Sequence, residues 1–168
     1  LYARWPKPAR FDRNLVVIGA GAAGLVSAYV AAATRAKVTL IERHKMGGDC
    51  LNYGCVPSKA LIRSATFLQQ AKHAASLGIQ RADVTYDFAE VMARVQRIVK
   101  TVEPHDSVER YTSLGVEVLH GDATIVSPWS VEVNGQTLTT RAIVIASGAR
   151  PLVPDIPGLQ AVRYYTSD

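Results

Sequence analysis

The sequence lacks several features that define large classes of proteins. It has only two cysteines, Cys50 and Cys55, among 168 residues, too few for the disulfide network of a small secreted domain. No stretch approaches the roughly 20 consecutive apolar residues of a membrane-spanning helix. No long block of like charges occurs, although the formal net charge is +5. We therefore expect no membrane span, no dedicated nucleic-acid site and, by default, a reducing cytoplasmic location.

The composition is that of a folded globular chain. Hydrophobic residues make up 48% and charged residues 20%, which excludes wholesale disorder. The chain begins at Leu1, without a signal-peptide pattern, which suggests a segment of a longer polypeptide. Residues 1–13 are predicted to be a tail or linker, residues 14–150 a folded domain, and residues 151–168, with three prolines, an extended connector.

Residues 14–42 have the pattern of a strand, a glycine turn, a helix and a second strand. The runs 14–18 and 37–41 are short and continuously apolar, as in parallel strands buried on both faces. Between them, Gly19-Ala-Gly-Ala-Ala-Gly24 matches GxGxxG, whose glycines permit a tight turn, backbone approach to a pyrophosphate and close helix–strand packing. Glu42 ends the second strand, where an acid can accept hydrogen bonds from ribose hydroxyls. The pattern predicts a dinucleotide site.

This glycine turn does not by itself distinguish FAD from NAD. Glu42 favours either of them over NADP, whose phosphate would prefer an arginine, but Arg43 is its neighbour in the chain. The alternative interpretation is that the three glycines serve only packing and that Glu42 is a surface residue.

The two cysteines are five residues apart at the predicted start of a helix. The turn Cys50-Leu-Asn-Tyr-Gly-Cys55 is short enough for a local disulfide, and a helix N-terminus lowers the pKa of a nearby thiol. Lys59, one helical turn beyond Cys55, adds positive charge. These features favour a disulfide that opens and closes during turnover. The alternatives are a zinc site, for which the histidines supply no recognisable second ligand pair, and a pair of inert buried cysteines.

Elsewhere the sequence predicts helices over 58–73 and 88–102, with residues 46–56 as a glycine-rich loop. From Gly115 the hydrophobic period becomes two, which predicts strands over 116–119, 123–126, 131–133 and 137–139 as a small antiparallel meander, with a hairpin turn at Asn134-Gly135. A further buried strand is predicted over 142–146. The expected fold class is α/β: a Rossmann-like parallel sheet with flanking helices plus a small antiparallel β-meander.

The segment Gly47 to Lys59, GGDCLNYGCVPSK, closely resembles the active-site segment of the FAD-dependent pyridine nucleotide–disulfide oxidoreductases. That family includes dihydrolipoamide dehydrogenase, glutathione reductase and mercuric reductase, and the Val-Pro-Ser-Lys continuation is more similar to the lipoamide and mercuric branch. The resemblance implies that residues 14–150 are the first segment of an FAD-binding domain and that 151–168 lead toward an NAD(P)-binding domain.

The resemblance also implies roles for individual residues. Cys55 would be the thiol beside the flavin, and Cys50 the interchange thiol that attacks the acceptor. Electrons would pass from NAD(P)H through FAD to the Cys50–Cys55 disulfide, and then to a small-molecule disulfide or a soft-metal acceptor such as mercuric ion. No resident metal is expected. The cofactor-binding residues would be Gly19, Gly21, Ala22, Ala23, Gly24, Glu42, Arg43, Gly48, Asp49, Cys50, Lys59, Ala123, Ser147 and Gly148.

Family members are far longer than this chain and form homodimers, in which a C-terminal domain supplies a His–Glu acid–base pair. His105 and Glu109 are four residues apart but lie in the wrong region, so we expect a surface pair. The intact parent is expected to be an oxidoreductase and a homodimer, whereas the 168 residues alone are expected to be inactive. The rival interpretation is a dinucleotide-binding module without turnover. A flavin monooxygenase or a simple NAD dehydrogenase would share the glycine turn but not the cysteine motif.

Overall fold

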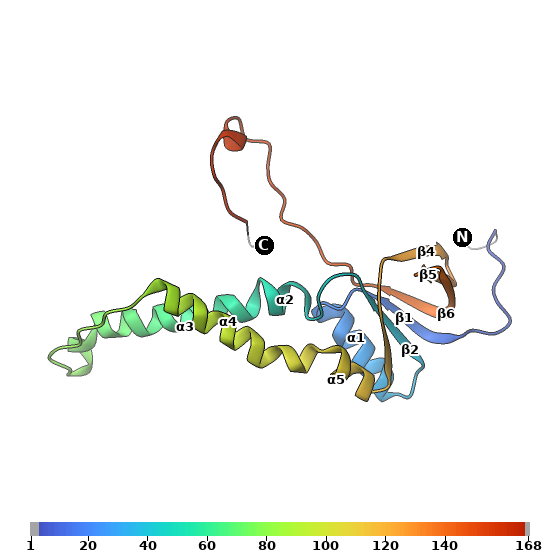
Figure 1. The fold of residues 1–168 in the computed structure, drawn as a ribbon, viewed down its shortest axis with the longest axis horizontal. Coiled ribbons are helices and arrows are strands. Elements are labelled where there is room, and N and C mark those ends of the chain that lie inside the picture. Colours follow the sequence, from blue (N-terminus) through green and yellow to red (C-terminus); the bar gives the residue numbers. More distant parts are fainter. Residues whose placement is uncertain (1–3, 167–168) are drawn as a thin grey trace.

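The centre of the fold is one six-stranded sheet with the strand order β3-β2-β1-β6-β5-β4 (Figure 1). The structure is a computed structural model and describes residues 4–166. The neighbours β3, β2, β1 and β6 run parallel, whereas β4, β5 and β6 form an antiparallel meander. The predicted α/β fold class is therefore confirmed. The strands are β1 (Arg13–Ile18), β2 (Val38–Glu42), β3 (Val116–His120), β4 (Ala123–Ser127), β5 (Ser130–Val133) and β6 (Gln136–Ile145).

Strands β1 and β2 are largely apolar because both faces of the sheet are covered. Val17 and Leu40 pack on one face with Leu25 and Ala28 of α1 (Ala22–Ala33). On the opposite face, Val16 and Ile41 pack with three side chains of the meander, namely Val131, Val133 and Leu138. This double burial explains the continuous hydrophobic runs that marked β1 and β2 in the sequence.

Two of the strand predictions need correction. The segment starting at Val116 is not the first strand of the meander, because β3 pairs in parallel with β2. The segments predicted as separate strands over 137–139 and 142–146 form the single strand β6. Its first half pairs with β5 and its second half with β1, and the fully buried Thr140 lies where the partner changes. Periodicity fixes which face a side chain takes but not which strand is the neighbour.

The helical elements cover the sheet and extend beyond it. Figure 1 shows α3 and α4 side by side as a hairpin that projects away from the strands. The predicted helix over 88–102 is confirmed as α4, whose first turn is capped by the Asp87 carboxylate accepting from the Ala89 amide at 2.8 Å. The remaining helices are α2 (Gly48–Asn52), α3 (Cys55–Lys72), α4 (Phe88–Val102), α5 (Val108–Ser113) and the 3-10 turns η1 (Ala74–Leu77), η2 (Glu103–Asp106) and η3 (Leu159–Ala161).

The segment predicted as a loop over 46–56 is instead largely helical. Cys50 lies within α2, and Cys55 is the first residue of α3. The two helices are separated only by Tyr53 and Gly54, whose amides both donate to the Asp49 carbonyl, at 2.9 and 2.6 Å. Two of the glycines that suggested a loop, Gly47 and Gly48, lie at the start of α2, where they have φ of 85° and 52°.

The residues before β1 contact the meander. The Asp12 carboxylate accepts from the Thr139 amide at 3.1 Å and from its hydroxyl at 2.7 Å, and the Lys7 ammonium lies 5.1 Å from the Trp129 ring centroid. At the other end, residues 151–166 extend away from the sheet (Figure 1). The boundaries 1–13, 14–150 and 151–168 remain predictions, and residues 1–3 and 167–168 lie outside the described part. No helix between residues 4 and 166 combines the length and apolar character needed to cross a bilayer.

Candidate functional site

The glycine turn connects β1 to α1 in a conformation that side chains would block. Gly19 has φ of 101°, in the left-handed region that favours glycine, and a Cβ there would collide with the carbonyl of Ala146. A Cβ on Gly24 would collide in turn with the carbonyl of Gly19. These two glycines let α1 begin directly against the ends of β1 and β6.

The N-terminus of α1 is not capped by any side chain. Its N-cap residue is Gly21, and no acidic residue lies in its first turn. The first amides of a helix have no partner within the helix, and together with the helix dipole they favour an anion. A Cβ on Gly21 would meet only Gly48, at 3.8 Å from its Cα, so the backbone there is accessible.

Glu42 joins the ends of the first two strands through its carboxylate. One oxygen accepts from the Ala20 amide at 2.6 Å and the other from the His44 amide at 2.7 Å. These two bonds hold the side chain beside the glycine turn. A carboxylate has about four acceptor positions, so lone pairs remain for hydroxyl donors.

A cavity of about 970 Å³ opens at the carboxyl ends of β1, β2 and β6, where open α/β sheets generally bind ligands. The structure brings eleven of the predicted residues to its wall. They are Gly19, Gly21, Ala22, Ala23, Glu42, Arg43, Asp49, Cys50, Ala123, Ser147 and Gly148. Residues 19 and 148 are far apart in sequence, and the parallel pairing of β1 with β6 brings them to the same end of the sheet.

Four of the predicted residues do not line this cavity. Gly24 packs against the carbonyl of Gly19, and Gly48 packs against the Cα of Gly21. Cys55 and Lys59 lie on the exposed surface of α3.

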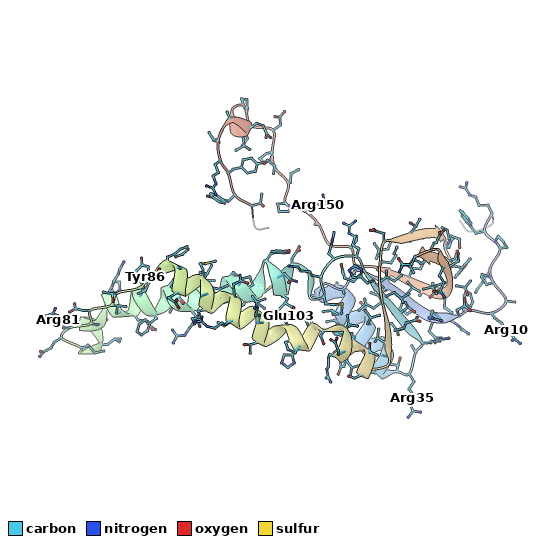
Figure 2. All side chains as sticks on the ribbon, viewed as in Figure 1. Arg10, Arg35, Arg81, Tyr86, Glu103 and Arg150 are labelled. Atoms are coloured by element: carbon cyan, nitrogen blue, oxygen red, sulfur yellow. The ribbon has the colours of Figure 1, made fainter. Side chains whose placement is uncertain are left out.

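Sequence reasoning missed several residues on the cavity wall. Ile18 and Ala146 are at or directly after strand ends, and their place at the carboxyl edge of the sheet was a usable signal. Tyr53 and Arg150 had no such signal, because each lies outside the regular elements. Figure 2 marks Arg150 where the C-terminal segment leaves the sheet. The other missed wall residues are His44, Gly121, Asp122 and Ala149.

The two cysteines are free thiols that interact with each other. Cys50 is partly buried on the cavity wall, and Cys55 is exposed. The hydrogen bond between the two thiols raises the pKa of Cys50, and burial, the charge of Cys55 and the charge of Asp106 raise it further, against a smaller opposing effect of Lys59. The expectation that the helix start lowers the thiol pKa is therefore wrong for Cys50. The main causes are the interaction with Cys55 and burial, and Cys50 lies in α2 rather than at the start of α3.

A hydrogen bond joins the cysteine segment to the glycine turn: the Gly47 amide donates to the Ala20 carbonyl at 2.9 Å. Within the cysteine segment, the side-chain amide of Asn52 donates to the carbonyls of Met46 at 3.0 Å and Gly48 at 2.8 Å. The thiol pair and the end of β1 are thus parts of one local structure.

His105 and Glu109 lie in different elements, η2 and α5, and both are exposed. Between residues 4 and 166 they form no ion pair with each other. Across the same residues, no group of three or more histidine, cysteine or acidic side chains could hold a metal ion.

The comparisons with known proteins agree with this geometry. Residues 13–168 match the family model described as "Pyridine nucleotide-disulphide oxidoreductase". The chain is 36% identical to a mercuric reductase of Bacillus cereus over 157 residues, 94% of this chain and 25% of that protein. It is 42% identical to a dihydrolipoyl dehydrogenase of Geobacillus stearothermophilus over 146 residues, 84% of this chain and 31% of that protein.

A solved structure of a flavoprotein disulfide reductase is also similar to this chain. The copper(II) complex of the HOCl-induced flavoprotein disulfide reductase RclA from Escherichia coli matches with a TM-score of 0.69 and 28% identity, over 88% of this chain and 31% of that one. The chain thus spans about a quarter to a third of the length of these relatives. Members of the family use FAD and NAD(P)H. The chain belongs to the pyridine nucleotide-disulphide oxidoreductase family.

Proposed function

We propose that this chain is the FAD-binding part of a flavin-dependent disulfide oxidoreductase. The protein would pass electrons from NAD(P)H through FAD to a Cys50–Cys55 disulfide and then to a disulfide or mercuric-type acceptor. The observation that carries the proposal is that two free thiols five residues apart interact with each other, and that one of them lies on the wall of a cavity that begins at a dinucleotide-type glycine turn.

The described residues fit a dinucleotide. The cavity volume of about 970 Å³ is at the upper end of the range of about 300–1,000 Å³ for small-molecule sites. The uncapped start of α1 offers amides to a pyrophosphate, and Gly21 leaves the backbone there uncovered. Glu42, already fixed by two amides, has acceptor capacity left for a ribose.

The proposed binding residues fall into two groups, most of them on the cavity wall, with Gly24, Gly48 and Lys59 outside it. The glycine turn, Glu42, Arg43 and Ala123 would hold the adenosine diphosphate half, and the cysteine segment would face the ring half. For the ring half we propose Gly48, Asp49, Cys50, Lys59, Ser147 and Gly148. When bound, FAD would supply hydride acceptance from NAD(P)H and the delivery of two electrons.

The chemistry of the chain's own residues is thiol–disulfide exchange. Reduction of the Cys50–Cys55 disulfide takes up two electrons and two protons and gives two thiols. The Cys50 thiolate then attacks one sulfur of an acceptor disulfide, which forms a mixed disulfide and releases one thiolate. Cys55 attacks the Cys50 sulfur of that mixed disulfide, which re-forms the internal disulfide and releases the second thiolate.

The test is FAD binding by the chain, measured as the absorbance of the protein-bound flavin after desalting. Gly21→Ala should weaken binding at least tenfold, because its methyl group would enter the cavity at the helix N-terminus. Since Gly21 has φ of −77°, alanine is tolerated there without strain. Gly78→Ala, at a glycine outside the cavity, is the control and should bind like the unmodified chain. Equal binding by Gly21→Ala and the unmodified chain would reject this site for FAD.

A further inference from the structure

A second cavity, which we call the hairpin cavity, lies on the two long helices. Its volume is about 370 Å³, and its wall comes from α3, from α4 and from residues 84–86, which lead into α4. Figure 1 shows these two helices projecting away from the sheet. Among the described residues, none lines both this cavity and the one at the strand ends. Its volume lies within the range of about 300–1,000 Å³ for small-molecule sites, so the hairpin offers a separate place for a ligand.

The polar centre of the hairpin cavity is Arg94 of α4. Its Nη1 atom donates to the Ala60 carbonyl at 2.8 Å and to the Ser64 hydroxyl at 3.3 Å, both on α3. These two bonds hold a partly buried guanidinium on the cavity wall. Among the described residues, the Nε and Nη2 atoms of this guanidinium have no hydrogen-bond acceptor. Two such adjacent nitrogens can bind both oxygens of one carboxylate, and arginine stays charged at physiological pH.

No negative charge on the wall offsets this cation. A second arginine, Arg63, also lines the hairpin cavity, and none of the described residues on its wall is acidic. The two acids that flank the segment before α4 have partners elsewhere. Asp83 forms an exposed ion pair with Arg81, and the Asp87 carboxylate accepts from the Ala89 amide at 2.8 Å. The cavity is therefore suited to an anion.

The rest of the wall is mostly apolar and partly aromatic. Phe67 and Leu68 line it from α3, and Tyr86 lines it from the segment before α4. The two aromatic side chains are 53% and 66% exposed, and Figure 2 labels Tyr86 on the hairpin. Aromatic rings on a cavity wall can stack on a planar ligand. A ligand with one negative charge and a ring would use both the arginine and the rings, whereas a phosphate would leave the apolar wall uncovered.

We propose that the hairpin cavity binds a small aromatic carboxylate, with its carboxylate on Arg94 and its ring against Phe67 and Tyr86. The site goes beyond the proposed flavin chemistry, because it shares no wall residue with the cofactor cavity. Arg94 selects for charge, since a carboxylate accepts two charge-assisted hydrogen bonds where a neutral amide of the same shape accepts weaker ones. The exposed Arg63 adds a smaller, screened attraction.

The test is binding of naphthalene-2-carboxylate, with naphthalene-2-carboxamide as its neutral counterpart, measured by isothermal titration calorimetry. We expect the carboxylate to bind roughly tenfold more tightly than the carboxamide. Arg94→Gln keeps a donor for the Ala60 carbonyl but removes the charge, so it should abolish this preference. Arg97→Gln, the same change at an exposed position of α4 outside the cavity, is the matched control and should bind the carboxylate like the unmodified chain.

Equal binding of the carboxylate and the carboxamide overturns the proposal, as does undetectable binding of the carboxylate or equal weakening in Arg94→Gln and Arg97→Gln. Inorganic phosphate that displaces the carboxylate at equal concentration rejects this ligand class. If Arg94→Gln does not fold, as judged by circular dichroism, Phe67→Ala decides. Loss of this exposed ring should weaken carboxylate binding about fivefold, and unchanged binding rejects the site. FAD binding should be the same in every variant, and its absence would contradict the proposed function alone.

Discussion

Gly48 of the cysteine segment lies against Gly21 of the glycine turn, backbone to backbone. A Cβ built on Gly48 would be 2.6 Å from the Cα of Gly21, a separation that side chains essentially never adopt. The adjacent bond from the Gly47 amide to the Ala20 carbonyl fixes the same approach. This contact couples the two motifs, because it holds the cysteine segment at a set distance from the start of α1.

The first prediction concerns this contact. Gly48→Ala should lower the free energy of unfolding by about 2–4 kcal/mol, because the methyl group adds a steric clash to the strain of a positive φ. Gly78→Ala is the matched control, since Gly78 also has a positive φ but nothing within 4 Å of its Cβ position. It should lose only about 1 kcal/mol. Urea unfolding measures both values, and equal losses would show that the Gly48–Gly21 contact is not tight.

The second prediction concerns Glu42. Glu42→Ala should destabilise the chain by about 2 kcal/mol even without ligand, because the amides of Ala20 and His44 lose a charged acceptor. Glu42→Gln keeps one acceptor oxygen and should lose about half as much. Glu132→Ala, at an exposed position of β5, is the control and should stay within about 0.5 kcal/mol of the unmodified chain in thermal or urea unfolding. A loss in Glu42→Ala no larger than in the control would contradict the anchoring role.

The third prediction separates the two cysteines. Mild oxidation of the chain should remove both free thiols and two hydrogens in mass, without forming dimers, because the two thiols are five residues apart and interact with each other in the folded chain. In the FAD-loaded protein, two-electron reduction should open the disulfide and produce a long-wavelength absorbance band, which Cys55→Ser should lack and which Cys50→Ser should show while its flavin is still oxidised. A band that survives in Cys55→Ser would reverse the assigned roles.

The fourth prediction concerns acid stability at the opposite end of the parallel strands. Burial by itself raises the pKa of Glu117, but hydrogen bonds from Thr39 and Arg13, with the Arg13 charge, outweigh burial and hold the pKa below its ordinary value of 4.5. A lowered folded-state pKa means that this stabilisation is complete above pH 4.5 and is lost as the pH falls toward the folded-state pKa.

Glu117→Gln should therefore reduce stability at neutral pH and flatten the decline below pH 4.5, as measured by thermal melting across that range. Glu132→Gln is the control and should keep the acid dependence of the unmodified chain. If Glu117→Gln has the same acid dependence as the unmodified chain, the hydrogen bonds of Glu117 with Thr39 and Arg13 do not contribute to stability. Because the Glu117 side chain is 44% exposed, the effect should be modest and should shrink in salt.

Much of the parallel half of the fold could be predicted from local patterns. Three kinds of element were predictable because they depend on residue types at short sequence spacing. They are the apolar runs of β1 and β2, the glycine turn and the amphipathic helix α4. The hairpin at Asn134-Gly135 is confirmed for the same reason, with φ of 50° and 74° at its two turn residues. The parallel partner of β3 was not predictable, because its alternation is equally compatible with the meander.

The sequence by itself determined the chemistry available to this protein: a glycine turn that admits a phosphate, an acid at the end of the next strand, and two thiols within six residues. Those properties depend on residue types at short spacing. Only the tertiary structure decided which groups share one environment. Pairing of β1 with β6 brings Ser147 to Gly19, and the bond from the Gly47 amide to the Ala20 carbonyl brings the cysteine segment to the glycine turn, because such neighbours are set by long-range packing that leaves no local pattern in the chain.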